Sequence, residues 1–432
     1  MPGALLAQLS PNGSDFQVNT YVTGNQQASA IAIDGAGRFV VAWESFGSGG
    51  SDHDSYSIHA RRYDAAGRSL GTAFQVNSST TSDQGVADVA ADGSGRFVVV
   101  WTSMASAGGD TDASSIQAQR YDAAGNPLGA EFQVNTYTPG YQAFPSVAAH
   151  ELGGFVVAWQ SQGSPGADAS GYSVQARRYG ADGAPLGSQF QVNTYGTNNQ
   201  QYPAVAIDGS GRFVIAWESL GSAGSDQSSY SVHARRYDAG GVPLGGEFQV
   251  NTTTTDQQGI PEIAADSDGR FEVVWFSLAS AGSDNDQTSV QMQRYDAAGV
   301  PLGGELQVNV STTGYQAFPA IAADDRGHFV VAWASEASGG TDLGSFSIQA
   351  RRFERDGAPY GGEFQVNSWT TGNQYYPSVA VDRGGNFVVT WTSATSGGGD
   401  ASGYSVQARR FDDLFRDGFE TGGTARWSLA TP

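Results

Sequence analysis

Short apolar runs alternate with segments rich in Gly, Ser and Asp along nearly the whole chain. Between residues 145 and 193, four such runs lie at 145–149, 155–159, 172–179 and 190–193. The second run, FVVAW, places large side chains at every other position, as a strand with one buried face requires. Short Gly-containing turns or one long polar loop connect the runs, so the segment predicts a four-stranded antiparallel meander.

The meander recurs with a constant spacing. Its last strand begins with the phrase FQVN at Phe16, and this phrase, with Leu replacing Phe once, begins again at Phe74, Phe132, Phe190, Phe248, Leu306 and Phe364. Neighbouring copies are 58 residues apart throughout. Four strands in a period of about 40 to 60 residues are typical of a propeller blade, and a closed ring of blades leaves no exposed sheet edge. The sequence therefore predicts an all-β fold, a seven-bladed β-propeller with four-stranded antiparallel blades.

The two ends of the array predict how the ring closes. We label the strands of each blade A to D, from the central channel outward. The repeats begin on a D strand at residues 16–20 and end on a C strand at residues 404–411. We therefore expect the N-terminal strand to complete the last blade. This assigns residues 1–15 to an N-terminal leader, 16–411 to the propeller and 412–432 to a C-terminal tail.

Two apolar positions are the same in all seven repeats. Strand A carries Ala32, Ala90, Ala148, Ala206, Ala264, Ala322 and Ala380, and strand B carries Trp43, Trp101, Trp159, Trp217, Trp275, Trp333 and Trp391. Alanine suits strands that crowd together at the axis, whereas large aromatic side chains dominate core burial. We expect the tryptophans to fill the wedge between neighbouring blades.

The connections predict two unequal faces. The A–B and C–D turns, such as DGAG at 34–37, are short and place Asp first and Gly last, as tight turns prefer. The B–C and D–A loops, such as 44–55 and 20–27, are long and polar. Long loops on a rigid scaffold usually carry binding sites, so we expect the working surface on this long-loop face.

Polar side chains recur on the predicted long-loop face and in strand C. The D–A loops carry Gln26, Gln84, Gln142, Gln200, Gln258, Gln316 and Gln374, and the B–C loops carry Asp52, Asp110, Asp168, Asp226, Asp284, Asp342 and Asp400. Strand C carries Arg62 and six equivalents through Arg410. A structural role fits them: glutamine bonds to loop backbone, aspartate caps a turn, and arginine pairs with a carboxylate at a blade seam. The alternative is a set of similar polar pockets for hydroxyl-rich ligands such as glycans, which Gln26 and its equivalents and Asp168, Asp226, Asp342 and Asp400 would line.

Three B–C loops contain alternating acids that make calcium a candidate cofactor. The pairs are Asp52 and Asp54, Asp110 and Asp112, and Asp284 and Asp286. Carboxylate oxygens in a Gly-rich loop suit Ca²⁺, but no loop has the full EF-hand spacing. Solvated acidic loop tips are the alternative interpretation.

Composition narrows the choice of partner. The chain has 43 acidic and 22 basic residues, a formal net charge of −21 and no lysine, which disfavours nucleic acid and anionic membranes. Cysteine is absent, so disulfides and thiolate metal sites are excluded. No apolar run approaches the about 18 residues of a membrane span. Glycans or surface proteins are the partners that we expect.

Residues that break the sevenfold symmetry are the candidates for catalysis, because a reaction needs different groups at one point. The five histidines have no metal-ligand spacing, and no G-x-S-x-G or phosphate-loop motif is present. Asp88 and Glu262 are acids on strand A, three blades apart, where they can line the channel. We expect a non-enzymatic, carbohydrate-binding module, with an adhesive protein–protein interaction propeller as the alternative; a propeller hydrolase such as a sialidase is a weaker one.

The repeat unit, best seen in residues 364–412, resembles repeats of large secreted and surface-attached bacterial proteins that are predicted β-propellers of uncharacterised function. The tail LFRDGFETGG at 414–423, with Trp427, is similar to the FxDGFExG…W ending of many exported gammaproteobacterial proteins. The resemblance implies a secreted or cell-surface location and supplies no catalytic residues. Residues 1–15 lack a basic leader followed by a long apolar run, so we expect no export signal there.

Overall fold

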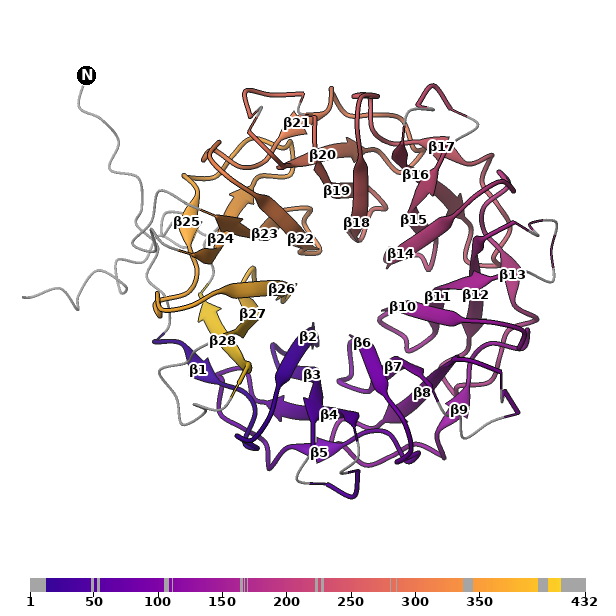
Figure 1. Cartoon of the computed structure of the whole chain (residues 1–432), viewed down its shortest axis with the longest axis vertical. Helices are drawn as coiled ribbons and strands as arrows, with labels where there is room; N and C mark the ends of the chain where they lie inside the picture. The colour runs from indigo at the N-terminus through magenta and orange to yellow at the C-terminus, as the bar shows by residue number, and fades with distance from the viewer. Residues whose placement is uncertain are drawn as a thin grey trace, which may run out of the picture.

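The computed structural model describes residues 13–412 except 48–49, 53–54, 105–108, 111, 164–165, 167, 169, 222–223, 227–228, 280, 285, 337–344 and 395–402. Within these residues, 28 strands form seven four-stranded antiparallel sheets. The sheets are arranged radially around a central channel (Figure 1). The predicted seven-bladed β-propeller is therefore confirmed.

One blade shows how the elements follow from the sequence. The third blade consists of β10 (Gln142–Ala149), β11 (Phe155–Gln162), β12 (Tyr172–Tyr179) and β13 (Phe190–Gln191). The A and B strands are each three residues longer than predicted. The D strand is shorter than predicted because a side-chain hydrogen bond takes the place of a backbone hydrogen bond to strand C. The Asn193 Oδ1 atom accepts the Val174 N–H at 2.9 Å.

The other blades repeat this plan. The remaining A strands are β2 (Gln26–Ile33), β6 (Gln84–Ala91), β14 (Gln200–Ile207), β18 (Gln258–Ala265), β22 (Gln316–Ala323) and β26 (Gln374–Val381). The B strands are β3 (Phe39–Phe46), β7 (Phe97–Ser103), β15 (Phe213–Leu220), β19 (Phe271–Ser277), β23 (Phe329–Glu336) and β27 (Phe387–Ser393). The C strands are β4 (Tyr56–Tyr63), β8 (Ser115–Tyr121), β16 (Tyr230–Tyr237), β20 (Ser289–Tyr295), β24 (Phe346–Phe353) and β28 (Ser405–Phe411). The D strands are β1 (Phe16–Gln17), β5 (Phe74–Gln75), β9 (Phe132–Gln133), β17 (Phe248–Gln249), β21 (Leu306–Gln307) and β25 (Phe364–Gln365).

The ring closes through its two chain ends. The sheet of the last blade has the order β1-β28-β27-β26, with Phe16 opposite Ala408 (Figure 1). Val18 is fully buried, and its N–H donates to the Val406 carbonyl at 2.9 Å. The Arg61 guanidinium, in the first blade, donates to the Val18 carbonyl at 2.9 Å. The predicted closure by the N-terminal strand is thus confirmed. The predicted tail lies outside the described residues, apart from Asp412.

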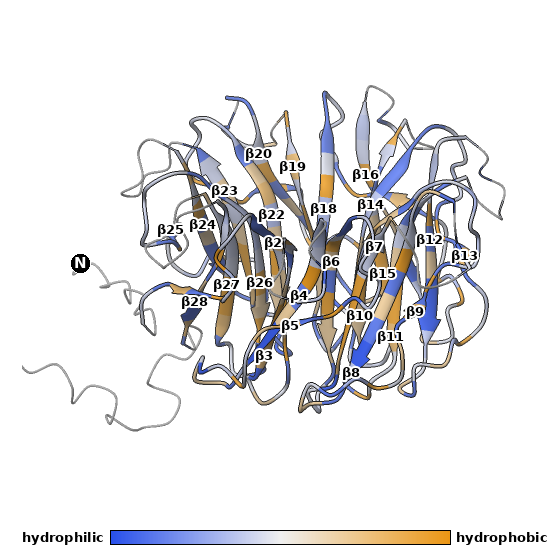
Figure 2. Cartoon of the chain, turned by 60° about the horizontal axis from the view of Figure 1, so that its bottom comes forward, coloured by the Kyte–Doolittle hydropathy of each residue, from blue (hydrophilic) through white to orange (hydrophobic). Residues whose placement is uncertain are grey.

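The core lies between the blades. Trp101 of the second blade is fully buried and belongs to one cluster with Ala30, Ala32 and Val40 of the first blade. All seven equivalent tryptophans are at most 1 % exposed, so the expected wedge role is confirmed. Hydrophobic positions accordingly run along the strands, and the loops at both faces mix hydrophilic, neutral and hydrophobic segments (Figure 2).

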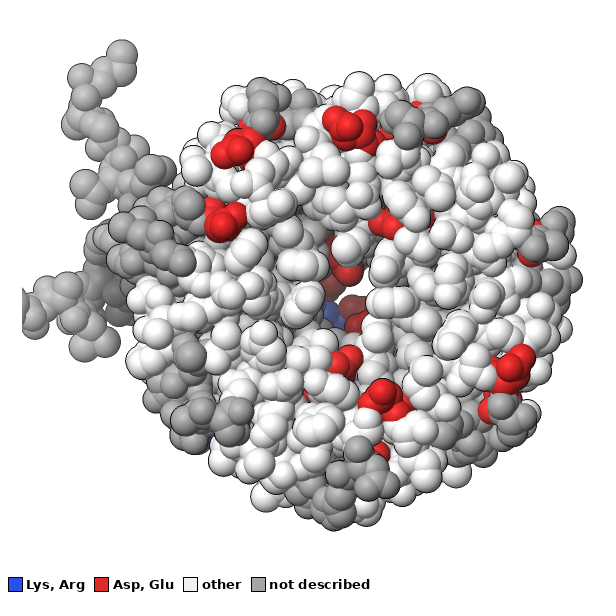
Figure 3. Space-filling view, viewed as in Figure 1, with Lys and Arg blue, Asp and Glu red and all other residues white. Residues whose placement is uncertain are grey.

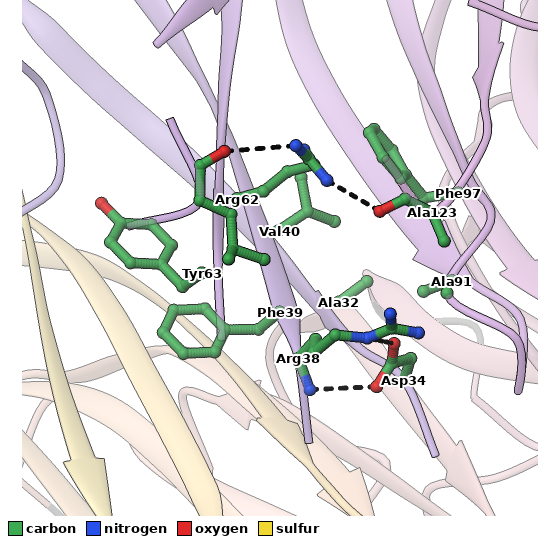
Figure 4. A pocket seen from close by; sticks show the side chains of 12 residues that line it. Ala32, Asp34, Arg38, Phe39, Val40, Arg62, Tyr63, Ala91, Phe97 and Ala123 are labelled. Carbon is green, nitrogen blue, oxygen red and sulfur yellow. Dashed lines mark hydrogen bonds and ion pairs between the residues drawn. The ribbon is translucent and has the colours of Figure 1, made fainter. Parts of the chain in front are cut away.

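The strand C arginine joins neighbouring blades differently from the prediction. Arg62 donates to two backbone carbonyls, that of Ala123 in the next blade at 2.7 Å and that of Leu70 at 3.2 Å (Figure 4). Arg410 makes the equivalent bond to the Ala65 carbonyl across the closure. Arg62 and Arg410 thus hydrogen-bond to carbonyls rather than to the expected carboxylate, although the charge of Asp122 also acts on Arg62. A planar guanidinium can satisfy the carbonyls of a C–D turn through its several N–H donors. The space at this seam measures only about 20 Å³.

Candidate ligand pocket on the channel axis

The repeated glutamines lie inside the blades. All seven are fully buried. The Gln26 Oε1 atom accepts the Trp43 indole N–H at 3.2 Å, and its amide donates to the Thr23 carbonyl in the D–A loop at 3.3 Å. The same indole bond joins Trp101 to Gln84, Trp159 to Gln142, Trp333 to Gln316 and Trp391 to Gln374. These positions fit the structural interpretation and offer a ligand no accessible amide.

The repeated aspartates are also buried where the structure describes them. Asp168 accepts an N–H of the Asn193 side chain at 2.8 Å, and Asp226 accepts one from Asn251 at 3.2 Å. Burial raises the pKa of Asp168, although its hydrogen bonds act in the opposite direction. Each aspartate thus ties a B–C loop to the following D strand. Asp342 and Asp400 lie outside the described residues.

The candidate calcium loops use their acids in local hydrogen bonds. Asp52, Asp110 and Asp284 are buried and bond to the asparagine of the following D strand. Asp112 and Asp286 accept the backbone N–H of Gly140 and Gly314, at 3.1 and 3.2 Å. Asp54 lies outside the described residues, and among those described no three His, Cys, Asp or Glu side chains are grouped to hold a metal ion. Calcium stays a prediction.

Every A strand contains a β-bulge near its start. In β2, Gln27 pairs with Glu44 and Ala30 with Ala42, so two residues lie opposite Trp43 alone. The first residue of each bulge has a φ between 47° and 53°. We call these seven the rim residues; they are Ala28, Val86, Phe144, Tyr202, Ile260, Phe318 and Tyr376. A bulge re-aims a side chain, and a positive φ is unusual outside glycine, above all for Val86 and Ile260, which are β-branched.

Neighbouring blades fix most of the bulges. The Val86 N–H donates to a Glu44 carboxyl oxygen at 2.6 Å, and the Tyr202 N–H donates to the Gln160 side chain at 3.2 Å. Equivalent bonds join Ala28 to Thr392, Phe144 to Thr102 and Ile260 to Glu218. The preceding blade therefore helps to hold the strained conformation, and the rim is part of the ring's own construction.

The rim residues line a cavity of about 610 Å³ at the long-loop end of the channel, which we call the axial pocket. Two aromatic pairs contribute to its wall: the rings of Phe144 and Tyr202 are 4.7 Å apart, and those of Phe318 and Tyr376 are 4.6 Å apart. The proline that follows the rim residue lines the pocket in five blades. The ring is visibly hollowed at its centre, with acidic side chains inside the opening (Figure 3). Small-molecule sites commonly have this size and this apolar lining.

Asp88 and Glu262 both line the axial pocket, as expected from their place on strand A. The other blades have Ala30, Ser146, Ala204, Ala320 and Ser378 at this position. Asp88 accepts the Val89 N–H at 2.8 Å and the Val147 N–H of the next blade at 2.7 Å. Glu262 makes no hydrogen bond within the part of the chain that the structure describes.

The surroundings of the two acids favour their neutral forms. Burial in the ring raises the pKa of Glu262 to about 8, and the charge of Asp88 adds to this effect. Burial raises the pKa of Asp88 to about 6, against its backbone hydrogen bonds. No Lys, Arg or His is among the residues that line the pocket. The pocket is therefore neutral to acidic.

The opposite end of the channel is crossed by ion pairs. Arg383, in the turn between β26 and β27, pairs with Glu151 and, at 3.1 Å, with Asp325. These side chains come from the A–B turns of three blades and border a cavity of about 110 Å³. The guanidinium lies over Gly35, where a Cβ would be 3.3 Å from the Arg383 Cζ atom. On the short-turn side, the Arg383 guanidinium and its two acidic partners therefore lie across the end of the channel.

Sequence reasoning missed the rim residues, although a signal was present. In each copy the third residue of strand A varies, as in QQASA, QAFPS and QGIPE, whereas the glutamine two residues earlier is constant. The positions that follow the constant glutamine vary as a group, and such variation points to a surface that is not needed for the fold. The bulge itself, which aims this residue into the channel, left no such signal.

The fold and the axial pocket define the class: a seven-bladed β-propeller with an open cavity at the long-loop end of its channel. The sequence matches no protein family model and none of the curated proteins. A Dyadobacter fermentans protein of unknown function has a TM-score of 0.52 and 9 % identity, over 93 % of this chain and 98 % of its own. A fungal alcohol oxidase in complex with copper has a TM-score of 0.50 and 12 % identity, over 93 % of this chain and 76 % of its own.

A puromycin hydrolase has a TM-score of 0.50 and 12 % identity, over 89 % of this chain and 51 % of its own. At these identities the likeness extends to the fold alone. Among the described residues there is no helix with the length and hydrophobicity of a membrane span.

Proposed function

We propose that the protein is a secreted or cell-surface, non-enzymatic binding module that takes a carbohydrate in the axial pocket. The observation that carries the proposal is the aromatic-lined cavity of about 610 Å³ on the long-loop face. This differs from a set of seven equivalent sites, because the repeated glutamines are buried, whereas the axial pocket is hollow enough for a ligand of a few sugar rings. The export of proteins with similar repeats supports an extracellular glycan as the ligand.

The chemistry of the pocket suits sugars. Tyr202 and Tyr376 offer rigid faces against which the C–H surface of a pyranose ring packs, and phenol groups that hydrogen-bond hydroxyls. Glu262 adds a carboxyl group that can donate as well as accept when it is protonated. Because cationic side chains are absent from the lining, neutral and basic sugars fit better than acidic ones.

Binding without turnover is favoured by the state of the two acids. Glycoside hydrolysis commonly uses two carboxyl groups, one as acid and one as base or nucleophile. Both oxygens of Asp88 accept backbone N–H groups, and the bond from Val147 joins two blades. Only Glu262 keeps a carboxyl group free of such bonds, which leaves a binding group without a second catalytic partner.

A glycan array followed by calorimetry with the best ligand tests the proposal. We expect Tyr202→Ala and Tyr376→Ala each to weaken binding about tenfold or more, through lost ring packing. Tyr141→Ala and Tyr315→Ala are matched controls, because these exposed tyrosines lie on the same face outside the pocket lining. Loss of binding in the controls alone would show that the ligand binds around Tyr141 and Tyr315 rather than in the axial pocket. Binding to no glycan on the array would overturn the proposal. Release of shortened products on long incubation would contradict the non-enzymatic part.

An adhesive, protein-binding role has one specific observation in its favour. Phe46, Met104 and Leu278 occupy equivalent positions at or just beyond the end of strand B on the long-loop face, and all three side chains are exposed. Exposed apolar residues on one face can mark a protein contact. Replacing all three with serine should abolish capture of a protein partner while leaving glycan binding intact, if this second function is correct.

A further inference from the structure

The most distinctive chemistry in the axial pocket comes from two acids in a position that is otherwise Ala or Ser. Asp88 lies on β6 and Glu262 on β18, and these two strands face each other across the channel (Figure 1). Their mutual influence is electrostatic: the charge of Asp88 contributes to the behaviour of Glu262. Neither acid has a cation near it among the residues that line the pocket.

We infer that Asp88 and Glu262 form a binding site for the ammonium group of an amino sugar, so that the ligand is an oligosaccharide with free amino groups rather than an acetylated or acidic one. This inference rests on the proposed carbohydrate-binding function and names its substrate class. Spermidine and other polyamines present the same ammonium chemistry without a sugar, and the experiment below separates the two sources.

The hydrogen-bonding capacity of the two acids fits an ammonium group. An ammonium group has three donors and no acceptor, whereas each carboxylate oxygen can accept two hydrogen bonds. Glu262 has all of its capacity unused within the described chain, whereas Asp88 already accepts two backbone N–H groups and a hydrogen bond from the Ser146 side chain. The Glu262 carboxyl faces the pocket rather than a protein donor, so a ligand that supplies donors can pair with it.

The aromatic wall adds to the selectivity. Tyrosine and phenylalanine faces attract cations, by about 0.5–2 kcal/mol when the contact is desolvated. Tyr202 on β14 and Tyr376 on β26 line the same pocket as the two acids. A glucosamine unit can therefore place its amino group toward Asp88 and Glu262 and its ring against a tyrosine. Arg383 does not compete for these acids, because it pairs with Glu151 and Asp325 at the other end of the channel.

Proton release gives an independent signature. The titratable groups that face the site are Asp88, Glu262, Tyr202 and Tyr376. At neutral pH the Glu262 carboxyl is largely protonated in the empty pocket, because burial raises its pKa to about 8. An ammonium group favours the carboxylate, so binding expels that proton. Calorimetry in two buffers of different ionisation enthalpy measures its release.

The test compares glucosamine oligomers, their N-acetylated counterparts and spermidine on the full chain. We expect the glucosamine oligomer to bind at least tenfold tighter than the acetylated one, with release of up to about one proton. Glu262→Gln should reduce this preference to within about threefold and abolish the proton release. Glu272→Gln, on β19 outside the pocket lining, should change neither. Asp88→Asn disturbs a bond between blades, so Glu262→Gln carries the test, with an unchanged melting temperature as its folding control.

The outcomes separate the two proposals. Equal binding of both oligomers would overturn the ammonium site and leave carbohydrate binding in place. Binding of spermidine alone, lost in Glu262→Gln, would support the ammonium site and overturn the carbohydrate proposal. Binding of none of the three would overturn the ammonium site, and the wider glycan array would then decide the proposed function. A preference for glucosamine oligomers that survives Glu262→Gln would also overturn the inference.

Discussion

The two ends of the channel are formed by the same seven A strands, yet their side chains differ in how far they are paired with one another. At the long-loop end, bulges aim variable side chains into an open cavity, and Glu262 is left without a hydrogen bond among the described residues. At the short-turn end, Arg383 spans the axis and is paired with two acids. One end keeps polar and aromatic groups available, whereas the other satisfies its own charges.

The turns explain why the short-turn end is so uniform. The Asp34 Oδ1 atom accepts the N–H groups of Ala36 and Arg38 at 2.9 Å, and Gly37 supplies the positive φ that ends the turn. Most of the other A–B turns repeat this arrangement with their own Asp and Gly. A turn that uses its side chains internally leaves little for a ligand. The difference teaches that repetition marks the scaffold here, and that variation within the repeat marks the site.

Both ends depend on the closed ring, so opening it should have the largest effect. Deleting residues 1–20 removes β1 and with it the buried Val18 and the contact between the rings of Phe16 and Tyr63. We expect the free energy of unfolding to fall by on the order of 5 kcal/mol, with aggregation through the uncovered edge of β28. Urea unfolding followed by tryptophan fluorescence measures the change. Deleting residues 1–12 keeps β1 and is the control; equal stability of both deletions would contradict the closure.

The sequence was sufficient for the architecture because the fold depends on spacing. A constant period, a tryptophan in each strand B and an array that starts on a D strand together predict the blade number, the interblade core and the closure through β1. The strand ends were less accurate. Asn193 bonds to the backbone of strand C where a ladder was expected, and a side chain that substitutes for backbone pairing leaves no periodic pattern.

The same logic misdirected the choice of site residues. Gln26 accepts a hydrogen bond from Trp43, and Asp168 accepts one from Asn193. Each blade needs the equivalent bonds for its own structure, so the repetition of these residues reflects a structural role. The rim was hidden because a bulge shifts the alternation of the strand by one residue and reverses which side chains face the channel. Asp88 and Glu262 were noticeable as departures from Ala or Ser, but their placement in one pocket depends on ring geometry that no local pattern contains.

A pH titration sharpens the contrast between the two ends. The folded-state pKa of Glu262, about 8, lies above the ordinary value of 4.5, so the folded protein holds this proton more tightly than the unfolded chain does. The stability that this difference contributes is fully present below about pH 4.5 and is lost as the pH rises through 8. Glu262→Gln should therefore unfold with a free energy about 1–2 kcal/mol above that of the wild type at pH 9, and nearly equal to it at pH 4.

Glu272 supplies the control for this titration. It lies on β19 outside the axial pocket, and burial raises its pKa to about 8 as well. Glu272→Gln should reduce the loss of stability at alkaline pH without affecting amino-sugar binding. If Glu262→Gln follows the wild-type stability curve from pH 4 to 9, water in the channel already solvates the carboxylate and the unpaired acid is not costly.

Backbone strain at the long-loop end predicts a substitution that stabilises the protein, whereas most substitutions destabilise it. The expected change is smaller than the two above. Val86 has a φ of 52°, which a β-branched residue rarely adopts and asparagine tolerates. Val86→Asn should raise the free energy of unfolding by about 0.5–1 kcal/mol, since relief of strain exceeds the loss of a half-buried methyl pair. Val89→Asn, in the same strand but buried and without a positive φ, should lower it by about 1–3 kcal/mol. Destabilisation by both would show that the bulge is not strained.

Breaking the ion pairs at the short-turn end should have the smallest effect. Arg383 and Glu151 are about half exposed, and exposed ion pairs contribute about 0–1 kcal/mol. Arg383→Ala should therefore lower the free energy of unfolding by less than about 1 kcal/mol, and added salt should shrink the difference further, since ions screen exposed charges. The affinity for a ligand in the axial pocket should stay within about twofold of the wild type, because Arg383 borders only the cavity at the opposite end. A tenfold change in that affinity would show that the two ends are coupled through the channel, and the short-turn end would then have to be counted as part of the site.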